Sequence, residues 1–353
     1  MVKTIKSIMI ILLITAILCS LLEIFLFITV RFPVVHQILP GPITKISRRI
    51  YVYHDMKIPM FMPEGGQFDS SLGYTSKPGR FLFSTNESTS ECLINSQGLR
   101  DTEAALDSPQ IIVLGDSYAW GWGVKQNETF AKILAAKTGL KVLNAGVPSY
   151  GTAREIMLLK RIKRDRLRYL IIQYCDNDYL ENLEFYDAGN KLITMSKEKY
   201  EENVKDYSVK SPYYFGKFLI ASAEIIKNNF EYLFGMGNVK KITAEAYKRP
   251  LNEAGIFINV LLHSGIDLSG VQLIVFNATV FDPSQNAFVI SLRKGIASAD
   301  YPAYINKMII LDATKFLNPK DHLFLLDGHF NPLAHQILAD KLAQQITSRP
   351  ASR

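Results

Sequence analysis

Apolar residues fill one long stretch near the start of the chain and later return in short runs. From Ile8 to Val30 the sequence is apolar except for Thr15, Ser20, Thr29 and the single acid Glu23. A helix needs about 20 such residues to cross a bilayer. The pattern predicts a transmembrane helix, and a buried core helix is the alternative.

The flanks of this stretch indicate how it would sit in a membrane. Lys3 and Lys6 precede it, as in a signal sequence, but the apolar run is longer than the core of a cleaved signal. We therefore expect an uncleaved signal anchor over residues 1–32. Basic residues also follow the run, beginning at Arg31, so the positive-inside rule leaves the orientation open. With a cytoplasmic N-terminus, the rest of the chain would be extracytoplasmic, or periplasmic in a Gram-negative cell.

The remainder divides into a proline-rich region and a region with alternating strands and helices. Residues 33–108 are rich in proline, glycine, serine and threonine, which favours loops and short strands over long helices. From residue 109 onward the apolar pattern predicts strands at 111–114, 141–143, 169–174, 271–276 and 308–311, and helices at 127–138, 152–165, 247–264 and 331–346. This alternation indicates a three-layer α/β/α (flavodoxin-like) fold with a parallel sheet over 109–347.

The alternation breaks between about 183 and 245. Polar, Lys- and Glu-rich sequence there gives way to an aromatic helix expected near 213–234. We interpret 183–245 as a helical insertion over the edge of the sheet, which could serve as a lid.

Charge and cysteine content exclude several classes of function. The formal charge is +7, but the basic residues are scattered apart from one run at 160–168, which we interpret as a solvated helix end. No nucleic-acid partner is expected. The three cysteines form neither a disulfide framework nor a zinc motif, and at most Cys92 could pair with Cys175. Without a metal-binding or phosphate-loop motif, neither a metal nor another cofactor is expected.

Polar residues follow several predicted strands, where an open parallel sheet binds its ligands. Ser117 comes after the first strand in the turn Gly115-Asp116-Ser117, and His329 comes before the last helix. A serine nucleophile needs a base, which His329 can supply, and Asp327 can hold the other ring nitrogen. The backbone N–H groups of Ser117 and Gly146 and the side-chain amide of Asn177 could bind an oxyanion. A glycine at 146 would let a ligand oxygen approach its amide.

These four segments resemble the four blocks of the SGNH, or GDSL-type, hydrolase superfamily. The resemblance covers about 93–345, including the lead-in Ile94-Asn95-Ser96-Gln97-Gly98-Leu99-Arg100-Asp101. It implies that Ser117, Asp327 and His329 form a catalytic triad, with Ser117, Gly146 and Asn177 as the oxyanion hole. Cys175 replaces a glycine common in the third block, and Leu326 stands where many members carry the aspartate. The spacing found here is similar to that of acetyltransferase-like members.

Other residues near these segments have less specific interpretations. His335 is expected on the surface of the last helix, and His322 lies at the wrong end of an apolar run to act as the base. For the aromatic residues after the nucleophile, core packing and a substrate platform remain equally open; these are Tyr118, Trp120 and Trp122.

The resemblance implies a serine-dependent ester hydrolase or O-acyltransferase. We expect it to act, through an acyl-enzyme, on acyl groups such as acetyl carried by an extracytoplasmic glycan or lipid. The lipid bilayer would bind residues 8–30, and a multi-pass membrane acyltransferase is a candidate partner. The alternative is a non-catalytic scaffold of the same fold that binds glycan or such an acyltransferase.

Overall fold

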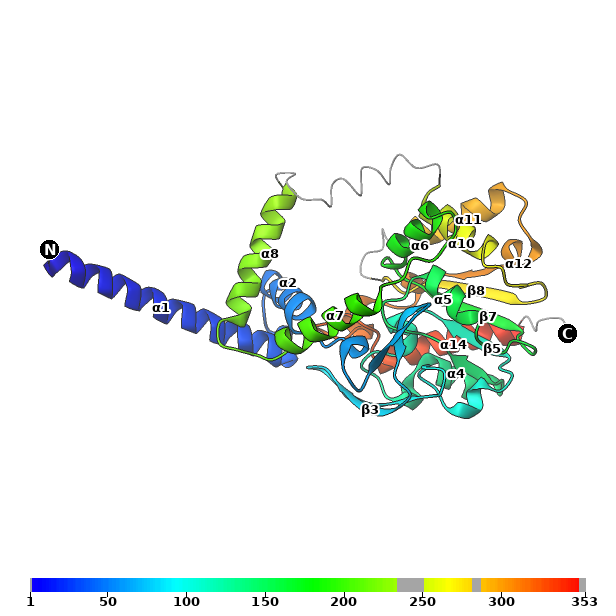
Figure 1. The fold of residues 1–353 in the computed structure, drawn as a ribbon, viewed down its shortest axis with the longest axis horizontal. Helices are drawn as coiled ribbons and strands as arrows, with labels where there is room; N and C mark the ends of the chain where they lie inside the picture. Colours follow the sequence, from blue (N-terminus) through cyan, green and yellow to red (C-terminus); the bar gives the residue numbers. More distant parts are fainter. Residues whose placement is uncertain (1, 234–250, 281–286, 349–353) are drawn as a thin grey trace.

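A five-stranded parallel sheet forms the centre of the protein. The computed structural model describes residues 2–233, 251–280 and 287–348. The strand order is β6-β5-β7-β8-β9 (Figure 1). The strands are β5 (Ile111–Leu114), β6 (Val142–Asn144), β7 (Tyr169–Tyr174), β8 (Gln272–Asn277) and β9 (Ile309–Leu311). Their parallel pairing confirms the predicted α/β fold class.

Helices cover both faces of this sheet and complete the predicted three layers. Successive residues of β5 alternate between two apolar cores: Ile112 and Leu114 face one, and Ile111 and Val113 face the other. The first core is closed by α5 (Thr152–Leu159), α6 (Asp178–Asp187), α10 (Glu253–Leu262) and α11 (Ala287–Ser298). The second is closed by α4 (Phe130–Thr138) and α14 (Pro332–Ser348). A short helix, α12 (Ala303–Asn306), links α11 to β9, and the short helical turns η7 (Ala313–Lys315) and α13 (Pro319–His322) link β9 to α14.

The region before the sheet combines two hairpins with a helix that the sequence pattern did not predict. The hairpins are β1–β2 (Gly66–Asp69 and Gly73–Ser76) and β3–β4 (Gly79–Ser84 and Thr89–Ile94). The unexpected helix is α2 (Gly41–Ile50), which begins after Pro40 and carries Pro42 in its first turn. Proline is tolerated in a first helical turn, so the prolines taken as signs of a loop here mark a helix start.

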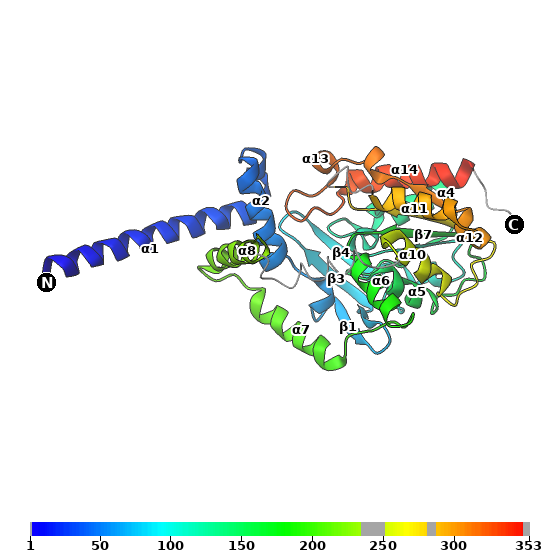
Figure 2. The same ribbon diagram turned by 90° about the horizontal axis from the view of Figure 1, so that it is seen from above.

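The first helix, α1 (Val2–Arg31), projects from the rest of the molecule (Figures 1 and 2). By length and composition, Lys3–Arg31 could cross a membrane, as an anchor or a signal sequence would. Only the C-terminal part of α1 enters the fold, where Leu26 and Val30 are buried in a cluster with residues of α2 and α8. The predicted long apolar helix is therefore present.

The helical insertion contacts both the hairpin region and α1. It contains α7 (Lys197–Lys210), which contacts β1 and β2, and α8 (Lys217–Leu233), which contacts α1 and α2 (Figure 2). This placement differs from the predicted cover over the edge of the sheet, because the apolar face of α8 meets the apolar end of α1. Residues 234–245 of the predicted insertion and the start of the helix predicted at 247–264 lie outside the described residues.

Candidate active site

The candidate nucleophile lies at the carboxyl end of β5. Gly115 follows the strand with φ +151°, and a side chain there would collide with Gln173 and Ala119. Asp116 then accepts a hydrogen bond from the Tyr118 N–H, at 3.0 Å, and caps α3 (Ser117–Trp120). Ser117 is consequently the first residue of a helix at the mouth of the sheet, as the sequence predicts.

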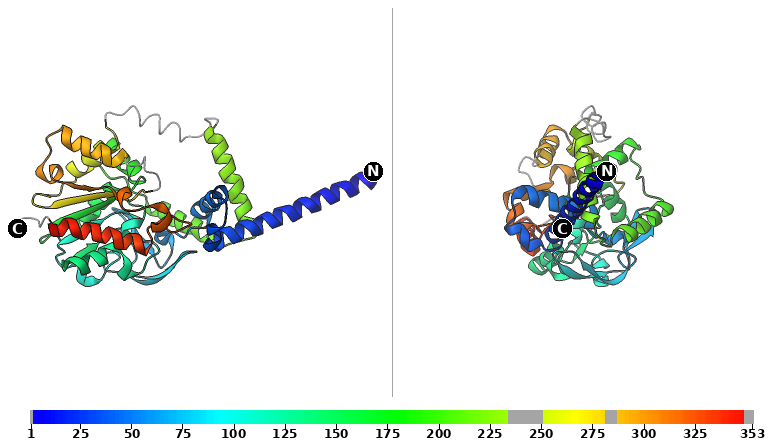
Figure 3. Two further views of the ribbon diagram at one scale, coloured as in Figure 1. Left: turned by 180° about the vertical axis from the view of Figure 1, so that it is seen from behind. Right: turned by 90° about the vertical axis from the view of Figure 1, so that its left-hand side faces the viewer.

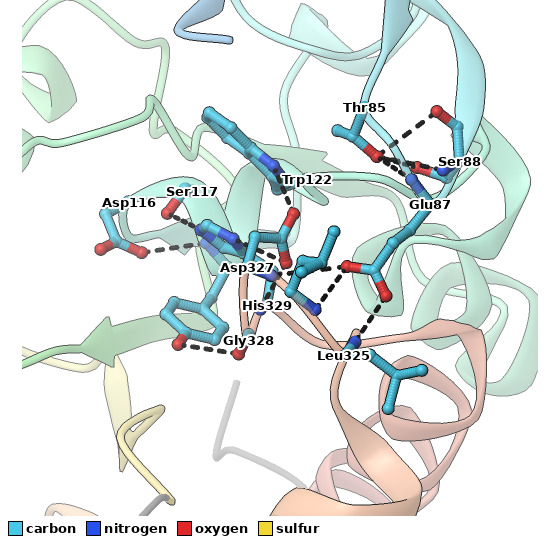
Figure 4. A network of polar contacts seen from close by, with 12 residues as sticks. Thr85, Glu87, Ser88, Asp116, Ser117, Trp122, Leu325, Asp327, Gly328 and His329 are labelled. Carbon is cyan, nitrogen blue, oxygen red and sulfur yellow. Dashed lines mark hydrogen bonds and ion pairs between the residues drawn. The ribbon is translucent and has the colours of Figure 1, made fainter. Parts of the chain in front are cut away.

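The structure brings Ser117, His329 and Asp327 together (Figure 4). His329 Nε2 lies 2.8 Å from Ser117 Oγ, which is hydrogen-bond distance. His329 Nδ1 lies 3.4 Å from Asp327 Oδ1 without making a hydrogen bond. The carboxylate instead accepts from the His329 backbone N–H at 2.9 Å. Contacts of catalytic groups are often long in a free enzyme, so this spacing is compatible with a triad.

Two aromatic residues after the nucleophile contact the loop that carries His329, which we call the histidine loop. The Trp122 indole stacks on the His329 ring, with 4.7 Å between ring centroids, and its Nε1–H donates to Asp327 Oδ2 at 3.1 Å. The Tyr118 hydroxyl donates to the Gly328 carbonyl at 3.3 Å. Of the two interpretations left open by the sequence, packing describes these side chains better, and the packing is against the candidate catalytic residues.

A carboxylate from a distant hairpin also holds this loop. Glu87, at the tip of β3–β4, accepts from the backbone N–H groups of Leu325, Leu326 and Asp327 (Figure 4). Burial raises the pKa of Glu87, and the neighbouring Asp327 raises it further, while the three N–H groups oppose the shift. Sequence reasoning missed Glu87 because nothing local marks it: the contact depends on how the hairpin packs.

The candidate oxyanion donors differ in their availability. Within the described part of the chain, no acceptor is found for the Ser117 N–H, as expected for a first-turn amide. The Gly146 N–H already donates to Asn144 Oδ1 at 3.0 Å. A Cβ on Gly146 would lie 2.5 Å from the Trp120 backbone nitrogen, so packing on α3 already requires a glycine here.

Asn177 lies near the nucleophile but on the surface. Burial raises the pKa of the Asp116 carboxyl, and hydrogen bonds from the Tyr118 N–H and the Asn177 side chain oppose that shift. Asn177 is exposed, and it lines a cavity of about 740 Å³ together with Ser149, Leu180 and Ile193. Ser117, Asp327 and His329 are not among the residues that line this cavity.

The competing histidines are held elsewhere in the fold. His335 was predicted on the surface, but it is 1% exposed, and its Nδ1 accepts from the Phe130 N–H at 3.1 Å. Burial lowers the pKa of His335 to about 3. His322 is also buried, and its Nδ1 accepts from the Asn318 N–H at 2.8 Å. The error for His335 arose because α14 is flanked by α4, so its inner face is wider than one apolar stripe.

Two further observations concern cofactors and cysteines. Among residues 2–233, 251–280 and 287–348, no three His, Cys, Asp or Glu side chains are grouped to hold a metal ion. Cys19, Cys92 and Cys175 are free thiols. Burial raises the pKa of the Cys175 thiol well above its ordinary value, which disfavours a thiolate beside the site.

Comparisons with known proteins find distant structural likenesses. No protein-family model matches the chain, and no curated protein matches its sequence significantly. A solved protein from Desulfitobacterium hafniense DCB-2, named for the G-D-S-L family of lipolytic proteins, aligns with 12% identity and a TM-score of 0.34 over 66% of this chain and 97% of its own. A lipase from goat rumen metagenome aligns with 15% identity and a TM-score of 0.34 over 70% and 99%.

An acetyl xylan esterase from the rumen bacterium Butyrivibrio proteoclasticus aligns with 10% identity and a TM-score of 0.34, over 68% of this chain and 64% of its own. Catalytic roles are therefore assigned from the geometry of this chain alone.

Proposed function

We propose that this protein is a serine-dependent ester hydrolase or O-acyltransferase. The observation that carries the proposal is the 2.8 Å contact between His329 Nε2 and Ser117 Oγ at the carboxyl end of the sheet. In this proposal Ser117 is the nucleophile, His329 the general base and Asp327 the group that orients the imidazole. Trp122 is a positioning residue, because it contacts both His329 and Asp327.

The proposed reaction forms and resolves an acyl-enzyme. His329 Nε2 accepts the Ser117 proton as Oγ bonds to the ester carbonyl carbon, and it returns that proton to the departing alcohol. In this proposal the Ser117 N–H and the Asn177 amide donate to the oxyanion. The Gly146 N–H can join them only by leaving Asn144. Water then attacks the acyl-enzyme in hydrolysis, or a sugar hydroxyl attacks it in transfer.

The proposed substrate is an O-acyl group, such as acetyl, on an extracytoplasmic glycan or lipid. The projecting apolar part of α1 supports an anchor, because its side chains from Ile8 to Leu22 are mostly exposed and would need lipid around them. The open cavity beside Asn177 could admit a sugar. A multi-pass membrane acyltransferase remains the proposed partner if the reaction is transfer.

The second candidate is a non-catalytic scaffold that binds glycan or a membrane acyltransferase. It would need neither a serine–imidazole contact nor a buried carboxylate behind the imidazole, yet the side chain of Asp327 is only 1% exposed. The arrangement favours the enzyme, and activity assays separate the two.

Ester hydrolysis by the full-length protein in detergent tests the proposal. Hydrolysis of p-nitrophenyl acetate should fall roughly a thousandfold in the S117A and H329A variants, and combining the two should add little, because triad members act as a unit. Substitution of the exposed Ser269 by alanine is the matched control and should change nothing. A folded S117A protein with the wild-type rate would refute the proposal.

A further inference from the structure

The anchor helix changes character at Glu23. On its N-terminal side, apolar residues such as Leu13, Leu18 and Leu21 are 59–61% exposed. Glu23 itself is 0% exposed, and beyond it Leu26 and Val30 are buried against other helices. About one bilayer thickness of helix therefore projects before Glu23, and the folded part begins there.

The Glu23 carboxylate caps the start of α8. It accepts from the Phe218 N–H at 3.3 Å, from the Leu219 N–H at 2.8 Å and from the Tyr213 hydroxyl at 3.0 Å. The first N–H groups of a helix have no partners within that helix and attract negative charge. This capping explains an acid in an otherwise apolar anchor, and it fixes the start of α8 at the level where the anchor enters the fold.

One face of α8 packs on the anchor. Phe218, Ala221 and Ile225 are buried in a cluster with Leu26 and Val30 of α1. Lys217, at the first turn, is buried as well, and it forms an ion pair with Asp55 at 3.3 Å. The helix is thus held in a fixed orientation relative to α1.

A second face of α8 is apolar but faces outward. Leu219, Ala223, Ile226 and Phe230 share this face by their spacing, and we call them the apolar strip; Leu219 is half-buried against the cluster that contains Leu26 and Val30. Ile226 is 69% exposed and Phe230 is 53% exposed. Glu224, Lys227 and Asn228 are also exposed and lie on a different side of the helix. Contact between the apolar face of such a helix and water is unfavourable.

The views of the molecule show where α8 lies relative to α1. Helix α8 runs crosswise to α1, and it lies between the projecting part of α1 and the sheet domain (Figures 1 and 2). The right-hand view of Figure 3 looks toward this junction from the free end of α1. If α1 crosses a bilayer, α8 lies along the bilayer surface at the depth of Glu23.

We propose that α8 is an interfacial helix. Its apolar strip inserts among the lipid acyl chains of the membrane leaflet nearest the sheet domain. This inference rests on the proposed membrane anchor. Helices with an apolar face and a polar face bind in this way, sinking about 5–10 Å into the boundary between headgroups and acyl chains. The anchor and α8 together hold the protein in one orientation on the membrane.

The elements that would rest on the membrane also contact the candidate active site. Leu326, next to Asp327, is fully buried in the cluster formed by α1, α2 and α8. The loop that carries His329 is therefore packed on the elements that would rest on the lipid. A substrate in the same membrane, or close to its surface, would meet the site at a constant height.

Tryptophan quenching in vesicles tests the position of α8. The full-length I226W and N228W variants, each reconstituted into phosphatidylcholine vesicles, place a tryptophan on the apolar strip or on the polar side. Bromine on the acyl chains should remove the added emission of I226W and leave that of N228W. Native Trp120 and Trp122 are 0% and 3% exposed, so their emission is the common background and reports folding.

Two results would overturn the inference, and they are distinguishable. If the wild-type protein does not float with the vesicles, the proposed membrane anchor is wrong, and the proposed insertion of α8 into the lipid is wrong as well. If it floats but the emission of I226W persists like that of N228W, the anchor stands and α8 does not contact acyl chains. Protection of I226W from both bromine and aqueous iodide would then indicate a protein partner on the apolar strip.

Discussion

Both carboxylate oxygens of Asp327 accept hydrogen bonds that do not come from the His329 imidazole. Its two oxygens accept from the Trp122 indole and from the backbone of His329, while the His329 Nδ1 lies 3.4 Å away. A carboxylate held in this way cannot rotate freely, so a small shift of the ring would complete the third contact. The departure from the commoner family spacing is thus compatible with a working orienting group. Asp327→Asn should be severe, because the imidazole could then take the wrong tautomer.

His335 should give the folded protein a dependence on acid that can be measured. Burial lowers its pKa from 6.5 to about 3, so between these values the unfolded chain binds a proton that the folded chain excludes. The free energy of unfolding contributed by this group is therefore intact above pH 6.5 and falls as the pH drops toward 3, by about 1.4 kcal/mol per pH unit.

Denaturant unfolding of the full-length protein in detergent, followed by tryptophan emission, measures this slope. The H335Q variant can still accept from the Phe130 N–H. Between pH 3 and 6.5 its free energy of unfolding should depend less steeply on pH, by the slope that corresponds to about one proton. Substitution of the exposed His263 by glutamine should leave the slope as it is. Equal slopes in the wild type and H335Q would contradict the burial of His335.

At the scale of elements, continuous apolar runs were enough to place all five strands of the sheet, because a strand buried on both faces has no competing pattern. The same reasoning failed for α2, where prolines indicated a loop, and it missed α7, whose exposed Lys- and Glu-rich surface buries only Tyr200. Ser117 and His329 could be predicted because each follows or precedes a regular element. Glu87 and Trp122 could not, since their partners lie about 240 and 205 residues away.

The β3–β4 hairpin should influence turnover although it touches no substrate. In E87Q, one of the two oxygens that now accept from the three backbone N–H groups would become an N–H₂ group, which cannot accept. The histidine loop should shift, and kcat should fall by roughly ten- to a hundredfold, because small misplacements of catalytic groups are costly. KM and the midpoint of thermal unfolding should change little.

Steady-state kinetics with p-nitrophenyl acetate separate kcat from KM for this variant. Glu91 lies on the same hairpin with its side chain 62% exposed, so E91Q is the matched control and should retain the wild-type kcat. If kcat is the same in E87Q as in the wild type, Glu87 does not position the loop.

For the whole molecule, the tip of the same hairpin joins the anchor to the sheet domain. Asn86 donates to the carbonyl of Val30 at 2.9 Å and lies beside the ion pair between Arg31 and Asp55, while Glu87 next to it holds the histidine loop. Adjacent residues of one hairpin tip thus contact the end of α1 and the candidate site, and Figure 4 shows the contacts of Glu87 with the site.

The location predicted from the sequence can be tested in cells. Full-length protein should fractionate with membranes and resist extraction by alkali, because Lys3–Arg31 would span the bilayer. A phosphatase reporter fused at the C-terminus should be active only outside the cytoplasm. Release by alkali would contradict the anchor, and an inactive phosphatase fusion would contradict its orientation.

The central claim is that Ser117 forms the covalent intermediate, and an active-site label tests it most directly. Full-length protein in detergent is treated with a fluorophosphonate, and the modified peptide is identified by mass spectrometry. Ser117 Oγ is expected to displace fluoride from the reagent, and labelling should be absent in S117A. Labelling of H329A should be roughly a thousandfold slower, because the imidazole must accept the serine proton. A label on another residue, or labelling of S117A at the wild-type rate, would contradict this claim.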